Sequence, residues 1–350
     1  MKKLNQPLLL AAMLLMAGSA YAQAPTNTYQ GPAFRTFANP GAAPTAPGDV
    51  NTAGPTSNNQ KGTYSKTYSD YSQDSYVSQT GSNNYATVDQ VNTSGGTRLG
   101  NTAILDQTGN NNNASQSQSA SGAAQGVSNY YTGSTRNFMR ATQNGNSSQT
   151  QQTQASGVAN NMAILQGEGT TGNRAIQRQG TDAGGASVIS QAQINQKRFN
   201  AVGGGSNNYA EQVQTGLEQS AKIDQEASSS YAKQTQSGGA DVAAGTNAND
   251  AYIHQGDPGT RNSAEQSQNG VGNKARIQQS VMSNGNDNYA MQTQNGRNNQ
   301  ADIDQRSSGN YAEQMQSNNN NYSSMVQSNV RSAAYSVQSG AANTAIITQH

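Results

Sequence analysis

The chain has 350 residues, of which 32% are hydrophobic and 11% charged, and its formal net charge is +1. So few large apolar side chains exclude a conventional globular core, and near-neutrality argues against a nucleic-acid partner, because no basic stripe is present to release counterions from phosphates. The absence of cysteine excludes a disulfide framework and a thiolate metal site.

The first 22 residues have the features of a secretory signal peptide. Lys2 and Lys3 form a basic start, residues 8–17 are apolar, and Ala20-Tyr21-Ala22 supplies small residues for cleavage before Gln23. The apolar run is well short of the roughly 20 residues that a membrane-spanning helix needs. We therefore expect cleavage rather than a membrane anchor, and an exported protein that is at first soluble.

Residues 23–72 differ in character from the rest of the mature chain. Six prolines fall in this segment, whereas Pro258 is the only proline after it. Proline cannot donate a hydrogen bond to a strand ladder. We expect a flexible leader here, and the sequence leaves open whether it carries an export signal or serves as a spacer.

A repeat occupies residues 73–349, and it is clearest at the C-terminal end. Between Asn288 and Gln349 a glutamine returns every eleven residues, and each glutamine closes a seven-residue unit such as NYAMQTQ or NQADIDQ, followed by a four-residue turn. Within a unit, odd and even positions differ in kind, which is the period of a strand with one buried face. The units alternate between glutamine and an apolar residue at the fifth position, so two strands and two turns make one rung.

Read backwards, the alternation predicts ten rungs from Asn84 to Gln349, preceded by an orphan half-rung that carries Gln73, Ser75, Val77 and Gln79. The fold class expected is therefore all-β, a two-sheet β-solenoid of stacked strand-turn-strand rungs. A disordered Asn/Gln tract would not hold this phase. The apolar fifth positions predicted are Leu105, Ala141, Ile164, Ile189, Ile223, Ile253, Ile277, Ile303, Met325 and Ile347. In three rungs a different residue is assigned to the glutamine position, namely Val88, Thr150 and Ser336.

Inward positions should form ladders of identical side chains, because stacked rungs lie about 4.8 Å apart. Stacked Gln and Asn amides can donate to the rung above and accept from the rung below, which meets the cost of burying them. The ladder residues predicted are Asn208, Ala210, Gln212, Gln214, Ala221, Ile223, Gln225, Asn288, Ala290, Gln292, Gln294, Asn299, Ala301, Ile303, Gln305, Asn310, Ala312, Gln314, Gln316, Gln327, Gln338, Asn343, Ala345, Ile347 and Gln349.

Outward positions should form ladders as well. Tyr209 and Tyr231 lie 22 residues apart, as do Tyr289 and Tyr311, so their rings should stack. The same register brings Glu211 next to Lys233 and Arg276 next to Asp302; solvated charges that keep the chain soluble explain these residues equally well. Glycines such as Gly216, Gly238, Gly270 and Gly296 recur where tight turns are expected. Insertions between Gln118 and Asn137 and between Gln191 and Asn208 should bulge from the ends of rungs.

The repeat resembles the curlin repeat, S-x5-Q-x-G-x2-N-x-A-x3-Q. The segment from Asn288 to Gln305 matches it at Gln294, Gly296, Asn299, Ala301 and Gln305, with Asn288 in place of the first Ser. The resemblance covers roughly Asn84 to Gln349. It implies a subunit of curli-type extracellular amyloid, which contributes to adhesion and biofilm matrix on the outer surface of a Gram-negative-type bacterium. It also implies export through a dedicated outer-membrane pore and assembly with a nucleator or a major curlin, and the sequence leaves open which of the two this chain is.

An enzyme is not expected. His254 and His350 have no neighbouring nucleophile or carboxylate arrangement typical of a catalytic triad or a metal site. Asp224, Asp302 and Asp304 are the nearest candidates for a carboxylate cluster, and solvated charges on the outer face explain them more simply. We expect no cofactor, no metal and no small-molecule substrate.

The rival hypothesis is a monomeric β-solenoid adhesin or an ice-binding protein, which would need a flat outer ladder of threonine or similar residues. Thr235 and Thr293 share an outer position with Val213, Ser267 and Met315, a mixture that does not favour ice binding. For a fibre subunit, the strand from Asn343 to Gln349 is the expected growth site, because an unpaired strand edge can template another chain.

Overall fold

The computed structural model describes residues 74–92, 101–120, 137–155, 157–158, 160–180, 187–188, 190–197, 205–217, 219–238, 249–256, 259–279 and 285–350. Residue Gln73 and the expected signal peptide and leader lie outside this part of the chain. All regular structure within it is β-strand, and none of it is a helix long and apolar enough to cross a membrane.

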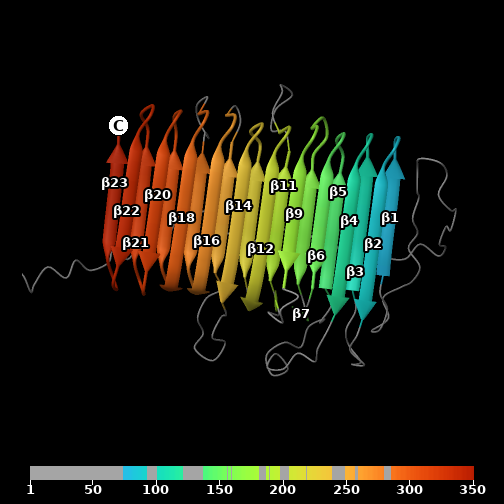
Figure 1. The fold of residues 1–350 in the computed structure, drawn as a ribbon, viewed down its shortest axis with the longest axis horizontal. Helices are drawn as coiled ribbons and strands as arrows, with labels where there is room; N and C mark the ends of the chain where they lie inside the picture. The colour runs from blue at the N-terminus through green and yellow to red at the C-terminus, as the bar shows by residue number, and fades with distance from the viewer. Residues whose placement is uncertain are drawn as a thin grey trace, which may run out of the picture.

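The strands form two parallel sheets that run side by side along the whole molecule (Figure 1). The first, which we call the Ile sheet, has eleven strands. In order they are β1 (Asp74–Thr80), β3 (Asn101–Thr108), β5 (Asn137–Gln143), β8 (Asn161–Gln166), β11 (Gln191–Gln196), β13 (Ser220–Gln225), β15 (Asp250–Gln255), β17 (Lys274–Gln279), β19 (Gln300–Gln305), β21 (Tyr322–Gln327) and β23 (Thr344–Gln349).

The second, the Gln sheet, has ten strands on its main path. In order they are β2 (Tyr85–Asn92), β4 (Asn113–Ala120), β6 (Gln149–Gln154), β9 (Arg174–Gln179), β12 (Tyr209–Leu217), β14 (Tyr231–Gly238), β16 (Ser263–Val271), β18 (Tyr289–Arg297), β20 (Tyr311–Ser317) and β22 (Ala333–Ser339). Two short strands complete it: β7 (Gly157–Val158) pairs with β10 (Ser187–Val188), and β10 pairs with the end of β12.

The predicted β-solenoid is confirmed. The chain passes from one sheet to the other at each turn, so the ten strands of the Gln sheet, each followed by a strand of the Ile sheet, make ten rungs, and β1 precedes them as a half-rung. Neighbouring strands pair at equal positions of the repeat; for example, Ile277 lies opposite Ile303 and Gln292 opposite Gln314.

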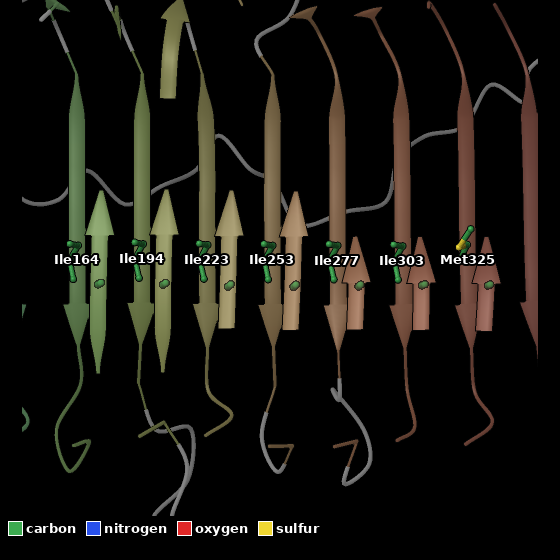
Figure 2. Packing of buried hydrophobic residues seen from close by; sticks show 14 residues of the cluster. Ile164, Ile194, Ile223, Ile253, Ile277, Ile303 and Met325 are labelled. Atoms are coloured by element: carbon green, nitrogen blue, oxygen red, sulfur yellow. The ribbon is translucent and has the colours of Figure 1, made fainter. Parts of the chain in front are cut away.

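Side chains alternate between the interior and the surface along each strand, as the period of two predicts. In β19, Ala301, Ile303 and Gln305 are buried, while Gln300, Asp302 and Asp304 point outward and are partly exposed. The main apolar cluster of the interior is a single file in which an isoleucine or methionine of the Ile sheet packs against an alanine of the Gln sheet (Figure 2). Alanine is small enough to let the two sheets close over the larger residue.

Two predicted positions were wrong, one by five residues and the other by two. Ile194, rather than Ile189, stands in the apolar file, opposite Ile164 and Ile223. Gln152, rather than Thr150, occupies the glutamine position opposite Gln116 and Gln177. The shift of two residues at Gln152 keeps every inward side chain inward, so the period alone does not determine it. The shift of five replaces one Ile-x-Gln segment, residues 189–191, by another, residues 194–196, and stacking against the neighbouring rungs selects the second. The loop that follows β11 accordingly begins after Gln196.

Glycine is required in the turns because the turns also stack. Gly270 has φ of 121°, and a Cβ atom added to it would overlap the backbone carbonyl oxygen of Gly296 in the next rung. Gly340 has a similar φ of 107°, but a Cβ atom there would approach only Asn343 Nδ2, at 3.5 Å. The two glycines therefore share a backbone conformation and differ in what lies beside them.

We expect Gly270→Ala to destabilise the folded chain more than Gly340→Ala. Both substitutions place alanine in a left-handed conformation, which costs about 1–3 kcal/mol. Only Gly270→Ala must also push two rungs apart, which adds roughly 1–3 kcal/mol. Chemical denaturation followed by circular dichroism measures both, and equal losses would contradict close stacking of the turns.

Candidate assembly site: amide ladders and end rungs

The seventh residue of each unit forms a hydrogen-bonded ladder along the Ile sheet. Each glutamine donates from Nε2 to Oε1 of the next, from Gln79 through to Gln349, with donor–acceptor distances of 2.5–3.0 Å. The bonds join all eleven strands of that sheet. The backbone ladder is thus doubled by a side-chain ladder that lies in the interior.

The Gln sheet carries two such ladders. At the fifth position the bonds are continuous from Gln116 to Gln314 at 2.7–3.0 Å. At the seventh position they are continuous from Gln179 to Gln338 at 2.8–2.9 Å. The fifth-position ladder stops where its neighbours are Val88 and Ser336. Gln116 Oε1 accordingly has no partner, because Val88 has no amide to donate to it.

Each ladder amide also uses its second hydrogen. Gln305 Nε2 donates to the carbonyl of Tyr289 at 2.8 Å, and Gln316 Nε2 donates to the carbonyl of Gln300 at 2.8 Å. Both acceptors lie in the other sheet, on the strand that precedes the glutamine in the chain. A buried amide contributes to stability only when its polar atoms are paired, and these amides bond along their own sheet and across to the other.

The first residue of each unit fixes the turn before it. Asn310 N donates to Asn288 Oδ1 at 2.9 Å and Asn321 N to Asn299 Oδ1 at 3.0 Å, so the asparagines also form a ladder. Some of their amide nitrogens also bond to turn carbonyls: Asn299 Nδ2 donates to the carbonyl of Asn318 at 2.7 Å, whereas Asn310 Nδ2 is buried without a partner.

The predicted ladder residues divide into two groups by burial. Those between Asn208 and Gln338 are all buried. Those at the last strand point inward but are only half-buried; they are Asn343, Ala345, Ile347 and Gln349.

The two ends of the solenoid are open. Within the described residues, β1 and β2 have no further strand on one side, and neither do β22 and β23 on the other. Each of these edges presents unpaired backbone groups to a potential partner strand. At the N-terminal end the inward residues Ala86, Val88 and Gln90 are half-buried, as those of β23 are at the other end.

The end strands also carry apolar residues on their outer faces, a feature that the sequence analysis missed. Tyr85 on β2, Tyr335 and Val337 on β22, and Ile346 on β23 are 59%, 61%, 74% and 66% exposed. They stand at outward positions of the repeat, so the signal that could have revealed them is an apolar residue at an even position of a unit in the first or last rung.

The predicted outer contacts of the central rungs are present. The rings of Tyr209 and Tyr231 stack with centroids 5.3 Å apart, and those of Tyr289 and Tyr311 with centroids 5.0 Å apart. The charged neighbours also pair: the carboxylate of Glu211 lies 3.8 Å from Lys233 Nζ and 2.6 Å from Arg178 Nη1. Arg276 and Asp302 approach to 3.7 Å.

One of the three carboxylates expected to be solvated is buried instead. Asp224 is 7% exposed; it accepts from Asn195 Nδ2 at 2.6 Å and from the Tyr252 hydroxyl at 3.0 Å. Burial, and next the Asp224 carboxylate, raise the pKa of Tyr252. The prediction failed because long side chains on the neighbouring rungs cover the outer face. Among the described residues, no three His, Cys, Asp or Glu side chains lie close enough together to hold a metal ion.

Among the described carboxyl groups, Asp302 has a large shift in pKa. Burial raises the pKa of Asp302 to about 6; the Arg276 guanidinium opposes this shift and Asp304 adds to it. Asp287 differs, because its hydrogen bond from Arg261 lowers the pKa of that exposed carboxyl.

No protein-family model matches the chain, and a comparison with curated proteins also gives no match.

The raised pKa of Asp302 predicts that the stability of the folded chain depends on pH. Because its pKa is about 6 when folded and near 3.8 when unfolded, the folded state holds the proton more tightly. The stabilisation that this gives is complete below pH 3.8 and is lost as the pH rises to about 6. Asp302→Asn should reduce the decrease in the free energy of unfolding as the pH rises from 3.8 to about 6. The variant should also be more stable than the unchanged chain at pH 7, as measured by denaturation at several pH values. Asp287→Asn is the control and should leave this decrease in the free energy of unfolding unchanged. If Asp302→Asn also left it unchanged, Asp302 would not be the group that causes it.

Proposed function

We propose that this chain is a secreted structural subunit that polymerises end to end into extracellular fibres of the curli type. The observation that carries the proposal is the pair of strand edges that have no neighbour among the described residues, one at each end of the solenoid. A monomeric solenoid needs its end rungs covered by polar or irregular structure. Here the described end strands instead present half-buried interiors and exposed apolar residues.

The interior supports the same function. Each strand added to the solenoid makes the same bonds as the one before it, as Gln305, Gln327 and Gln349 do in succession. A second copy stacked on β23 can continue both backbone and amide ladders, which is the arrangement of cross-β fibres. Polymerisation thus repeats the interactions that fold the subunit.

The remaining parts of the proposal rest on the sequence. The secretory features of residues 1–22 suit export, and the resemblance to the curlin repeat suggests a dedicated outer-membrane pore, a location at the cell surface, and a partner that is either the nucleator or the major subunit. Adhesion and biofilm matrix are the roles of such a fibre.

A monomeric adhesin or ice-binding protein has less support. The outward column that runs through Val213, Thr235, Ser267, Thr293 and Met315 is confirmed as one continuous file of neighbours. Its side chains differ in size and polarity, so they do not form the flat, regular surface that ice recognition requires.

The free edge of β23 indicates how to test growth. The carbonyls of Asn343 and Gln349 accept hydrogen bonds from Tyr322 N and Ser328 N of the neighbouring segment at 2.8 Å. Odd-numbered residues of β23 therefore face β21, and the even-numbered Ile346 and Thr348 face the open edge. Proline at Ala345 and Ile347, the positions that sequence alone suggests, would break the subunit's own pairing, whereas proline at an open edge position is tolerated.

We expect the purified chain to form fibres with spacings of about 4.8 and 10 Å, and the double change Ile346→Pro, Thr348→Pro to slow seeded elongation at least tenfold. The matched control is Ser121→Pro, Gly126→Pro, in a segment outside the described residues, and it should elongate normally. Fluorescence of an amyloid dye gives the rates. Protein that stays monomeric for days at tens of micromolar would contradict the proposal. Equal elongation rates for the terminal variant and the control would show that growth occurs at a site other than β23.

A further inference from the structure

The described solenoid begins and ends in the same sheet. Both β1 and β23 belong to the Ile sheet, which has eleven strands against ten on the main path of the Gln sheet. An odd total of strands limits how one copy can be stacked on another. The inference below rests on the proposed function, since it concerns how copies join within a fibre.

Successive strands are related by a two-fold screw along the solenoid axis. Gln327 on β21 donates to the carbonyl of Tyr311 on β20, Gln338 on β22 to Tyr322 on β21, and Gln349 on β23 to Ala333 on β22, at 2.8–2.9 Å. The acceptor is the second residue of the preceding unit in every case, whichever sheet the donor occupies. A half-turn about the axis with a half-rung rise therefore maps each strand onto the next.

Two head-to-tail arrangements follow from this symmetry. If the next copy keeps the same orientation, its β1 pairs with β23, and the place between β22 and its β2 stays empty in the Gln sheet. That gap would leave two strand edges facing an unfilled space about 4.8 Å wider than a normal spacing, with their backbone groups unpaired. If the next copy is turned by 180° about the axis, its β1 pairs with β22 and its β2 with β23, and no place is empty.

We propose that copies of this chain join by a half-turn about the fibre axis, so that the Ile sheet of one subunit continues as the Gln sheet of the next. The occupant of each open end is thus a second copy of the chain, and successive subunits alternate in orientation along the fibre.

The exposure of the end strands matches this arrangement. Inward residues are half-buried on β2 (Ala86, Val88) and on β23 (Ala345, Ile347). On β1, Val77 is half-buried and Gln79 is buried, and on β22 the inward residues are buried. The half-turn therefore pairs the two most open strands, β2 and β23, with each other.

The fifth-position residues at the junction are compatible as well. The half-turn places Ile347 against Val88 of the next copy, an apolar pair where most strands of the Gln sheet carry glutamine. Ser336 comes against Val77, and its hydroxyl is already bonded to Ser323 Oγ at 3.0 Å within its own subunit. No amide is brought against an apolar side chain at this position, and the seventh-position ladder continues from Gln338 to Gln79 and from Gln349 to Gln90.

The turns at the junction have the same conformation. The half-turn stacks the turn at Gly340 and Ala342, with φ of 107° and 57°, on the turn at Gly81 and Asn83, with φ of 109° and 56°. In both turns the following asparagine donates from Nδ2 to the carbonyl four residues back, Asn343 to Ser339 at 3.3 Å and Asn84 to Thr80 at 3.1 Å. Two turns of one conformation can stack as the turns inside the subunit do.

Paired cysteines test the orientation, since the chain has none of its own. A disulfide needs Cα atoms about 4.4–6.8 Å apart, which suits neighbouring parallel strands. The half-turn brings Thr348 next to Asp89 and Val337 next to Ser78 of the adjacent copy, all at outward positions. Fibres of the full-length double variants Thr348→Cys, Asp89→Cys and Val337→Cys, Ser78→Cys should cross-link on oxidation into covalent multimers.

The matched control is Thr348→Cys, Ser78→Cys, which combines one cysteine from each reactive pair. It should stay uncross-linked in fibres, giving at least a tenfold lower yield of multimers. Cross-linking of this variant in place of the other two would overturn the half-turn and indicate the unrotated stack, with the empty place filled by a strand from outside the described solenoid. Fibres in which no pair cross-links would overturn it too, while leaving polymerisation itself intact. Failure to form fibres at all would instead overturn the proposed function, and this inference with it.

Discussion

The structure depends on one constraint, that a buried primary amide must have hydrogen-bond partners. Gln266 accepts from Gln234, donates to Gln292, and donates across to the carbonyl of Tyr252, at 2.9–3.0 Å. Those partners exist only because the rungs before and after place an amide at the same point. The requirement explains why strand length and inward residues are conserved from rung to rung within the chain, while insertions occur only between strands. Hydrophobic packing is confined to narrow files of isoleucine, methionine and alanine.

Much of this could be predicted from the sequence because the ladders are themselves a sequence repeat. The alternation of Gln314 and Met325 at equal positions identifies the two sheets, and the period of two identifies the buried face. The register at Gln152 could not be determined, since the inward and outward faces are unchanged by a shift of two residues. The register at Ile194 was missed because two Ile-x-Gln segments lie five residues apart in that part of the chain. The burial of Asp224 was also missed, because it depends on Tyr252, which is remote in sequence and covers it from the next rung.

Regularity that stabilises the interior has a consequence at the ends. A ladder that satisfies each amide with the next rung has no internal reason to stop at a given rung. Here Val88 and Ser336 end the fifth-position ladder without a glutamine, yet at the seventh position Gln349 remains only half-buried on the last strand. An end of this kind favours a second copy over solvent, because the copy supplies the partners that the interior rungs already have.

Hydrogen exchange of the glutamine side-chain amides tests the central claim directly. The inward amides of Gln212, Gln234 and Gln266 should exchange as slowly as the backbone amides of their own strands, since each is held by two donated bonds in a dry interior. The outward Gln278 and Gln300 serve as internal references and should exchange rapidly. Nuclear magnetic resonance of the side-chain NH2 groups distinguishes the two sets; inward amides that exchange as fast as the outward ones would contradict the account.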